Sequence, residues 1–78
     1  MHHSIFLRME YLLVKFDERR GVLVDNVKEG FTNEVIELET GTHTISLIEP
    51  NDFTPELREI ILRRTTSTRP KVIRFEKV

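Results

Sequence analysis

The fold is decided by residues 22–48, which read VLVDNVKEGFTNEVIELETGTHTISLI. Near the end of this stretch His43, Ile45 and Leu47 alternate with threonine and serine, which is the period of a half-buried β-strand. Near its start Asp25-Asn26 separates two valine-containing runs, and both residue types tolerate the left-handed backbone that a two-residue hairpin turn requires. We therefore expect strands at 22–24, from 27, at 34–38 and at 42–48, with turns at 30–33 and 39–41.

The same rhythm continues on both sides of this stretch. Residues 11–16 form an apolar run, and the polar cluster at 17–21 suits a hairpin loop to the next strand. Residues 57–64 fit a strand or a helix opened by Pro55; we favour the strand, because the segment is short for a helix and 71–77 looks like its hairpin mate. Residues 50–55 and 65–70 are expected to be loops. The prediction is an all-β fold, a small antiparallel β-sandwich of about seven short strands.

The length and composition indicate one small domain. We assign residues 10–78 to it and residues 1–9, which include His2-His3, to an N-terminal extension or tag remnant. The chain has no cysteine, so disulfides and thiolate metal sites are excluded, while the cellular compartment stays open. No stretch offers the ~20 apolar residues of a membrane-spanning helix. The apolar run at 5–7 is too short for the core of a signal peptide, so no signal peptide is expected.

The order of motifs in residues 22–47 resembles the PEGA domain. That family has a strand ending in Val-Asp-Gly, a Gly-x-Thr-Pro corner and then Leu-x-x-Gly-x-His-x-Val. In this sequence the three places are taken by Val24-Asp25-Asn26, Gly30-Phe31-Thr32-Asn33 and Leu38-Glu39-Thr40-Gly41-Thr42-His43-Thr44-Ile45. Residues 50–53 follow where the family has Pro-Gly-Tyr, so the match runs from residue 21 to about residue 64. Asn26 stands in place of a glycine and Asn33 in place of a proline.

The resemblance implies a small β-sandwich, and a prealbumin-like sandwich related to carboxypeptidase regulatory domains is the nearest alternative. It also implies a non-catalytic accessory module of larger bacterial and archaeal proteins, often at the cell surface or envelope, although a cytoplasmic location stays open. On this interpretation five residues are structural fastenings of the sandwich: Asp25, Gly30, Thr32, Gly41 and His43.

Candidate chemistry in the sequence is sparse. His43 fits a general base or a metal ligand, but no Ser or Asp follows at the spacing of a catalytic triad, and a ring bonded to a loop carbonyl is the favoured interpretation. Asp25 and Glu29 flank a tight turn, where carboxylates more often bond to the turn itself than form a catalytic pair. We expect no catalytic residue, no cofactor and no metal, and we do not expect an enzyme.

Positive charge gathers near the end of the sequence. The candidate contacts for an anion or a partner are Arg63, Arg64, Arg69, Lys71 and Arg74. Together with Arg58 they form a basic group with which Glu56, Glu59 and Glu76 interleave, so the favoured interpretation is a solvated edge strand that charge protects from aggregation. The net charge of −1 also argues against a dedicated nucleic-acid binder.

Two functions of different class remain open. The first is a non-catalytic accessory or interaction module, which binds a protein, polysaccharide or cell-surface component or acts as a spacer. The alternative is anion or nucleic-acid binding through the basic C-terminal hairpin. The expected state is a monomer or a weak edge-to-edge homodimer, and the partner itself is not identified by the sequence.

Overall fold

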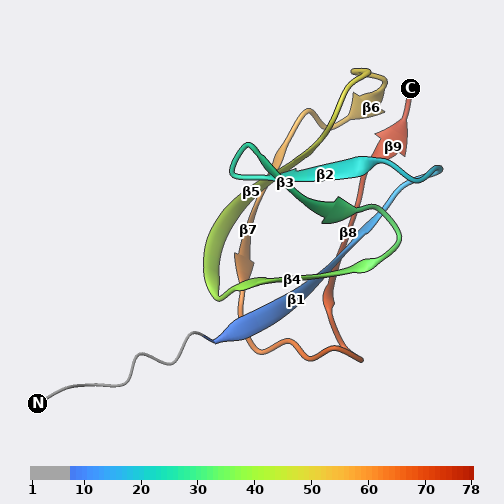
Figure 1. Ribbon diagram of the computed structural model, residues 1–78. Helices are drawn as coiled ribbons and strands as arrows, with labels where there is room; N and C mark the ends of the chain where they lie inside the picture. The colour runs from blue at the N-terminus through green and yellow to red at the C-terminus, as the bar shows by residue number, and fades with distance from the viewer. Residues whose placement is uncertain (1–7) are drawn as a thin grey trace, which may run out of the picture.

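The computed structural model describes residues 8–78, which contain nine β-strands and no helix (Figure 1). The strands are β1 Met9–Lys15, β2 Gly21–Val24, β3 Val27–Phe31, β4 Val35–Glu39, β5 Gly41–Leu47, β6 Phe53–Thr54, β7 Arg58–Leu62, β8 Lys71–Arg74 and β9 Glu76–Lys77. They form three sheets with the orders β4-β1-β8, β3-β2-β5-β7 and β6-β9. The all-β prediction is confirmed. Over the same residues, no helix long and apolar enough to cross a membrane is present.

The local sequence determines the turn between β2 and β3 and which face of β5 is buried. Asp25 and Asn26 have φ angles of 51° and 70°, and they join Val24 directly to its antiparallel partner Val27. This is the two-residue turn that the sequence predicted. In β5, Ile45 and Leu47 are buried while Thr44 and Ser46 are not, which confirms the predicted alternation.

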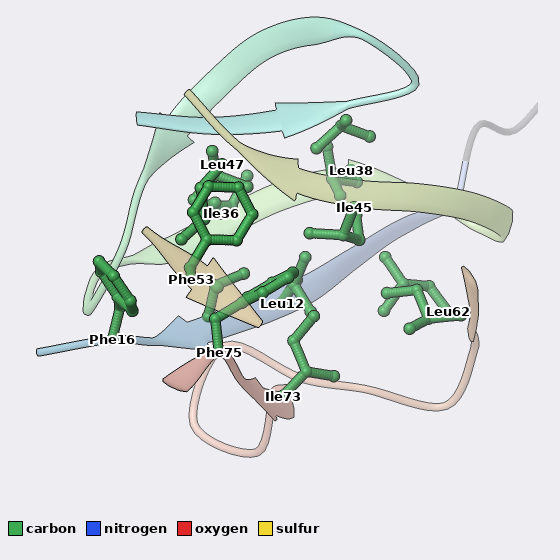
Figure 2. Packing of buried hydrophobic residues seen from close by; sticks show 14 residues of the cluster. Leu12, Phe16, Ile36, Leu38, Ile45, Leu47, Phe53, Leu62, Ile73 and Phe75 are labelled. Atoms are coloured by element: carbon green, nitrogen blue, oxygen red, sulfur yellow. The ribbon is translucent and has the colours of Figure 1, made fainter. Parts of the chain in front are cut away.

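Both larger sheets bury their side chains in one core (Figure 2). Its fourteen members are Leu12, Val14, Phe16, Val22, Val24, Ile36, Leu38, Ile45, Leu47, Phe53, Ile60, Leu62, Ile73 and Phe75. Three aromatic rings pack edge to face within it: the Phe53 centroid lies 6.4 Å from that of Phe16 and 5.6 Å from that of Phe75. The core therefore depends on β6 and on the β8–β9 junction as well as on the larger sheets.

Two expected hairpins are wrong. β1 pairs with β4 and β8, whereas β2 pairs with β3 and β5, so residues 17–20 cross between sheets instead of forming a hairpin loop. Likewise β7 pairs with β5, and β8 runs parallel to β1, so the basic C-terminal hairpin does not form and the sheets are not purely antiparallel. The physical reason is that residues 63–70 are long enough to cross from one sheet to the other, as Figure 1 shows at the base of the view.

The count of seven strands is also corrected to nine. Residues 50–55, expected to be a loop, contain β6, which pairs with β9 through Phe53 and Lys77. The expected strand at 71–77 is interrupted at Phe75, whose N–H still bonds the Lys15 carbonyl at 3.0 Å. Residues 58–62 are a strand, which decides between the two alternatives for that segment. β1 begins at Met9, at the end of the segment assigned as an extension, and residues 1–7 of that segment lie outside the described residues.

Candidate functional site

Asp25 and His43 meet beside the β2–β3 turn. The Asp25 N–H donates to the Thr44 carbonyl at 2.8 Å, and Asp25 Oδ1 accepts the Thr44 N–H at 2.9 Å. His43 Nδ1 lies 2.9 Å from Asp25 Oδ2, and His43 Nε2 lies 2.7 Å from the Glu39 carbonyl oxygen. Both ring nitrogens face acceptors, so an imidazolium that donates twice satisfies both. The ring thereby ties β5 to the β2–β3 turn and to the end of β4.

These contacts shift the pKa values of both side chains. Partial burial opposes the positive charge of His43, but the hydrogen bonds to the Glu39 carbonyl and to Asp25 together outweigh it and raise the pKa of His43 above its ordinary 6.5. The Thr44 N–H, and after it the His43 ring, lower the pKa of Asp25 below its ordinary 3.8. Asp25 and His43 therefore form an ion pair over the pH range in which Asp25 is ionised and the His43 ring is protonated on both nitrogens.

The free energy of unfolding is expected to depend on pH through His43. A group whose pKa is higher in the folded state stabilises the fold fully below its unfolded pKa of 6.5 and loses that contribution as the pH rises through the folded value. Urea denaturation of the wild type and of His43→Gln, between about pH 6 and about pH 9, measures this. The stability difference between the two proteins should shrink as the pH rises. A difference that stays constant would mean that the folded state does not favour the imidazolium.

A second polar network surrounds Arg20 at the other end of β2. The guanidinium is buried and donates to acceptors in the loop that precedes β6 and to one acceptor in its own 17–20 segment. These acceptors are the carbonyls of Ile48 (3.3 Å) and Pro50 (2.9 Å), the carboxylate of Asp52 (2.9 and 3.2 Å) and the carboxylate of Glu18. Lys77 of β9 donates to the second oxygen of Glu18 at 2.7 Å. Arg20 therefore holds the 17–20 crossing against the loop that precedes β6.

Thr32 fixes the backbone next to this arginine. Its N–H donates to the Arg20 carbonyl at 2.8 Å, and its Oγ1 accepts the Arg20 N–H at 2.8 Å while donating to the Glu18 carbonyl at 2.7 Å. The neighbouring Asn33 amide accepts from the Phe16 N–H at 3.2 Å and donates to the Phe16 carbonyl at 3.0 Å. The corner at 30–33 is thus joined to both ends of the 17–20 crossing.

The charges of the Arg20 network reinforce one another. Asp52, and after it Glu18, raise the pKa of Arg20, so the guanidinium stays charged. The Arg20 hydrogen bond lowers the pKa of Asp52 although burial opposes it. Lys77 first and Arg20 second lower the pKa of Glu18. Carboxylates with lowered pKa values are poor proton donors near neutral pH, so this network fits a structural role.

The two glycines among the motif residues have different roles. A Cβ added at Gly30 would lie 2.8 Å from Cγ1 of buried Ile36, so the missing side chain lets β3 approach β4. Gly41 has a φ of 125°, and its backbone conformation alone accounts for glycine because an added Cβ would meet nothing within 4 Å. The structure therefore brings Asp25 and His43 into contact, puts Thr32 beside Arg20 and leaves Gly30 and Gly41 with backbone roles.

The connection from β7 to β8 is held against β1 by Thr65. The Thr65 N–H donates to Glu10 Oε1 at 2.9 Å, and the Thr65 hydroxyl donates to the same oxygen and accepts the Tyr11 N–H at 2.8 Å. A tight turn follows, in which Thr66 and Arg69 exchange backbone hydrogen bonds of 3.2 and 3.0 Å. The Thr66 hydroxyl also accepts the Arg69 N–H at 3.0 Å. Residues 63–70 are therefore attached to β1 through Thr65 and closed internally by the turn from Thr66 to Arg69.

Glu10 is a buried carboxylate that the sequence analysis passed over. The Thr65 hydroxyl, and after it the Thr65 N–H, lower the pKa of Glu10 although burial opposes this. Among residues 8–78 its Oε2 has no hydrogen-bond partner and lies 3.7 Å from Arg8 Nη2. Glu10 and Leu12 are two residues apart in β1, so their side chains lie on the same face of the strand. The alternation of the sequence would therefore have placed Glu10 on the inner face. No such signal marks Arg20, which lies in a polar cluster.

The five basic residues that the sequence singled out lie on this connection and on β8, and we call them the basic edge. Arg63, Arg64 and Arg69 belong to the connection, Lys71 and Arg74 belong to β8, and all five are exposed. None of them forms an ion pair with another residue of 8–78, whereas Arg19, Arg20 and Lys77 do. Residues 57–78 hold seven of the twelve Lys and Arg but two of the thirteen Asp and Glu, so the basic edge dominates this part of the chain.

β8 leaves one side open for pairing. The Phe75 N–H points toward β1, where it bonds Lys15. Because successive residues direct their backbone groups to opposite sides of a strand, Val72 and Arg74 direct theirs away from β1. Among the described strands none lies on that side of β8. An extended segment from another chain could therefore pair there.

A cavity of about 340 Å³ lies where the ends of β3 and β4 diverge, and we call it the acidic cleft. Its apolar lining comes from Met9, Val24, Val27 and Leu38, and its polar lining comes from Asp25, Glu29, Glu37, Glu39 and His43. Glu29, Glu37 and Glu39 form no ion pair with other residues of 8–78. β3 and β4 end their sheets on the side opposite to β7 and β8. The cations of β8, Lys71 and Arg74, are therefore separated from the acidic cleft by β1, whereas Arg63 follows Leu62, which pairs with Gly41 near Glu39.

The charged groups of residues 8–78 fit fastening and binding better than proton transfer. All four carboxylates with shifted pKa values, Glu10, Glu18, Asp25 and Asp52, have lowered ones. Across the same part of the chain, no three His, Asp or Glu side chains are grouped so that they could hold a metal ion.

Comparison with protein-family models, with curated proteins and with solved structures finds no match for the chain.

Proposed function

We propose that the chain is a small β-sandwich of the PEGA type that serves as a non-catalytic interaction module. The fold proposal is supported by the single core shared by two sheets. The family proposal is supported by the motif residues in order: the left-handed turn at Asp25, the close approach at Gly30, the positive φ of Gly41 and the fastening of His43 to the turn before β5. The fold itself does not define a function, so the function is sought in residues on its surface.

The binding surface in this proposal is the basic edge, and its partner is an acidic protein segment in extended conformation. The observation that carries the proposal is that five exposed cations lie together without an ion pair among the described residues. Thr65 fastens the connection that carries three of them, so binding costs little conformational entropy. An added strand would hydrogen-bond Val72 and Arg74 on the open side of β8 while its carboxylates meet the flanking cations.

A nucleic acid is the alternative ligand for the same cations. Tracking phosphates requires a positive field that continues beyond residues 63–74, whereas Glu59 and Glu76 flank this stretch and the net charge is −1. The open side of β8 can form main-chain hydrogen bonds with an added peptide strand, whereas a sugar-phosphate backbone cannot pair with it as a strand. For this reason the acidic protein segment is the proposed partner.

A labelled peptide of alternating glutamate and valine tests the proposal by fluorescence anisotropy. Arg63→Gln combined with Arg69→Gln should weaken its binding about fivefold, because an exposed charge pair contributes ~0.2–1 kcal/mol. Arg19→Gln combined with Lys28→Gln is the matched control, since it removes the same charge beside Phe31 and should change affinity less than about twofold.

Three results would count against this function. An equal loss in both double variants would mean that net charge, and not the basic edge, attracts the peptide. Tighter binding of a single-stranded DNA oligonucleotide than of the peptide at ~150 mM salt would favour the nucleic-acid alternative. Binding of neither probe would exclude the basic edge as a binding surface for these classes.

A further inference from the structure

We propose that copies of this chain bind one another head to tail, with the basic edge of one copy against the acidic cleft of the next. This inference rests on the proposed function, because it names a second copy as the acidic partner of the basic edge. Charge is segregated in this domain: residues 57–78 are strongly basic, and the cleft is lined by three carboxylates that form no ion pair with other residues of 8–78.

The acidic cleft has the chemistry that an arginine or lysine side chain requires. Val24, Val27 and Leu38 give it an apolar lining, along which the aliphatic stem of a basic side chain can lie. The carboxylates of Glu29 and Glu39 lie beside that lining and can accept charge-assisted hydrogen bonds. An apolar ligand would leave those carboxylates without a partner, so a cation on an aliphatic stem fits the lining better.

The β8 cations of the basic edge can meet an acidic cleft only between molecules. In the order β4-β1-β8 the acidic strand and the basic strand are separated by β1, and in the order β3-β2-β5-β7 the two edges are separated by β2 and β5. Each copy therefore presents its β8 cations and its acidic cleft to different neighbours. A contact between unlike surfaces repeats from copy to copy and gives a row or a ring.

A symmetric dimer is opposed by the same charges. Pairing two basic edges would place Arg69, Lys71 and Arg74 of each copy against one another, and pairing two clefts would do the same with glutamates. The edge-to-edge homodimer considered from the sequence brings like charges together in either arrangement. The head-to-tail contact brings opposite charges together, and with a net charge of −1 two copies have little long-range repulsion to overcome.

Sedimentation velocity of the full chain tests the inference. At ~20 mM salt the average sedimentation coefficient should rise with protein concentration, and at ~500 mM salt the rise should disappear because the charges are screened. Two variants, Glu29→Gln/Glu39→Gln and Lys71→Gln/Arg74→Gln, should each lose the rise when studied alone. These four side chains are exposed, so both variants should keep the wild-type melting curve, which is checked first.

Mixing the two variants gives the sharpest result. One variant keeps only the basic edge and the other keeps only the acidic cleft, so the equimolar mixture should associate again and stop at a one-to-one complex. Self-association of either variant alone at the wild-type level, or a mixture that stays monomeric, would overturn the inference. If the wild type stays monomeric but binds the acidic peptide, the head-to-tail inference fails and the proposed function stands. If it also fails to bind the peptide, the proposed function fails as well.

Discussion

Replacing Phe75 with alanine is expected to remove most of the stability of the domain. The Phe75 side chain is 0% exposed, and its ring lies edge to face with Phe53 between β6 and β8. Truncating a buried phenylalanine to alanine costs about 3–5 kcal/mol. A domain of 78 residues has a free energy of unfolding of about 4–12 kcal/mol in total. So small a domain without disulfides is expected near the lower end of that range, where one such substitution leaves a small margin or none.

Urea denaturation followed by circular dichroism measures this loss. Val72→Ala on the same strand is the control, because Val72 is 54% exposed and its truncation should cost less than about 1 kcal/mol. Phe75→Leu, which keeps much of the volume, should fall between the two. If Phe75→Ala unfolded at the same urea concentration as the wild type, the placement of the β8–β9 junction over the core would be wrong.

Arg20→Met is expected to lower the melting temperature by more than about 15 °C, whereas Arg19→Met should lower it by no more than about 5 °C. The two arginines are neighbours with the same chemistry, but the Arg20 side chain is 5% exposed and that of Arg19 is 61% exposed. Removing Arg20 leaves Asp52 and two backbone carbonyls without their donor. Removing Arg19 costs only a solvated ion pair with Glu34 and a contact over the Phe31 ring.

Thermal unfolding of the two variants makes the comparison. Arg20→Lys adds a further check: the ammonium keeps the positive charge but cannot bridge the same acceptors, so its melting temperature should lie between those of the wild type and Arg20→Met. Equal decreases in melting temperature for the Arg19 and Arg20 variants would contradict the conclusion that the buried Arg20 holds residues 17–20 against the loop before β6.

The elements that the sequence predicted correctly are those whose cause is local. Ile45 and Leu47 alternate with polar residues over the length of β5, so period alone places them in the core. Asp25 and Asn26 form the turn because both accept a positive φ. β6 and β9 have two residues each, which is too short for any period to appear, and pairing alone defines them.

Strand pairing was mispredicted where distant contacts decide it. Residues 57–64 and 71–77 are close in sequence, which favours a hairpin, yet the connection between them is fastened by Thr65 to Glu10, 55 residues away. That bond helps to keep the connection against β1, which β8 then joins in parallel. Nothing in the spacing of the two strands distinguishes a connection that turns back from one that crosses between sheets.

The candidate surfaces were predictable to different extents. The basic edge is a cluster in sequence, so composition reveals it. The contact between Asp25 and His43, 18 residues apart, follows from the β2–β5 register that sets Val24 opposite Ile45, and the motif order of a family was the available guide. The acidic cleft draws on β1, β3, β4 and β5 and on the β2–β3 turn, and only the packed sheets bring those segments together.

An amide-resolved NMR titration of the isotope-labelled chain with the acidic peptide tests the basic edge most directly as the binding surface. The chemical shifts of residues 63–74 should change together, with Val72 and Arg74 among the largest because their backbone groups face the open side of β8. The chemical shifts of the Thr32 and His43 amides should stay unchanged, because these two residues hold the sandwich together and lie outside the proposed binding surface. Changes centred on the acidic cleft or spread evenly over the domain, or no changes at all, would contradict the proposed binding surface.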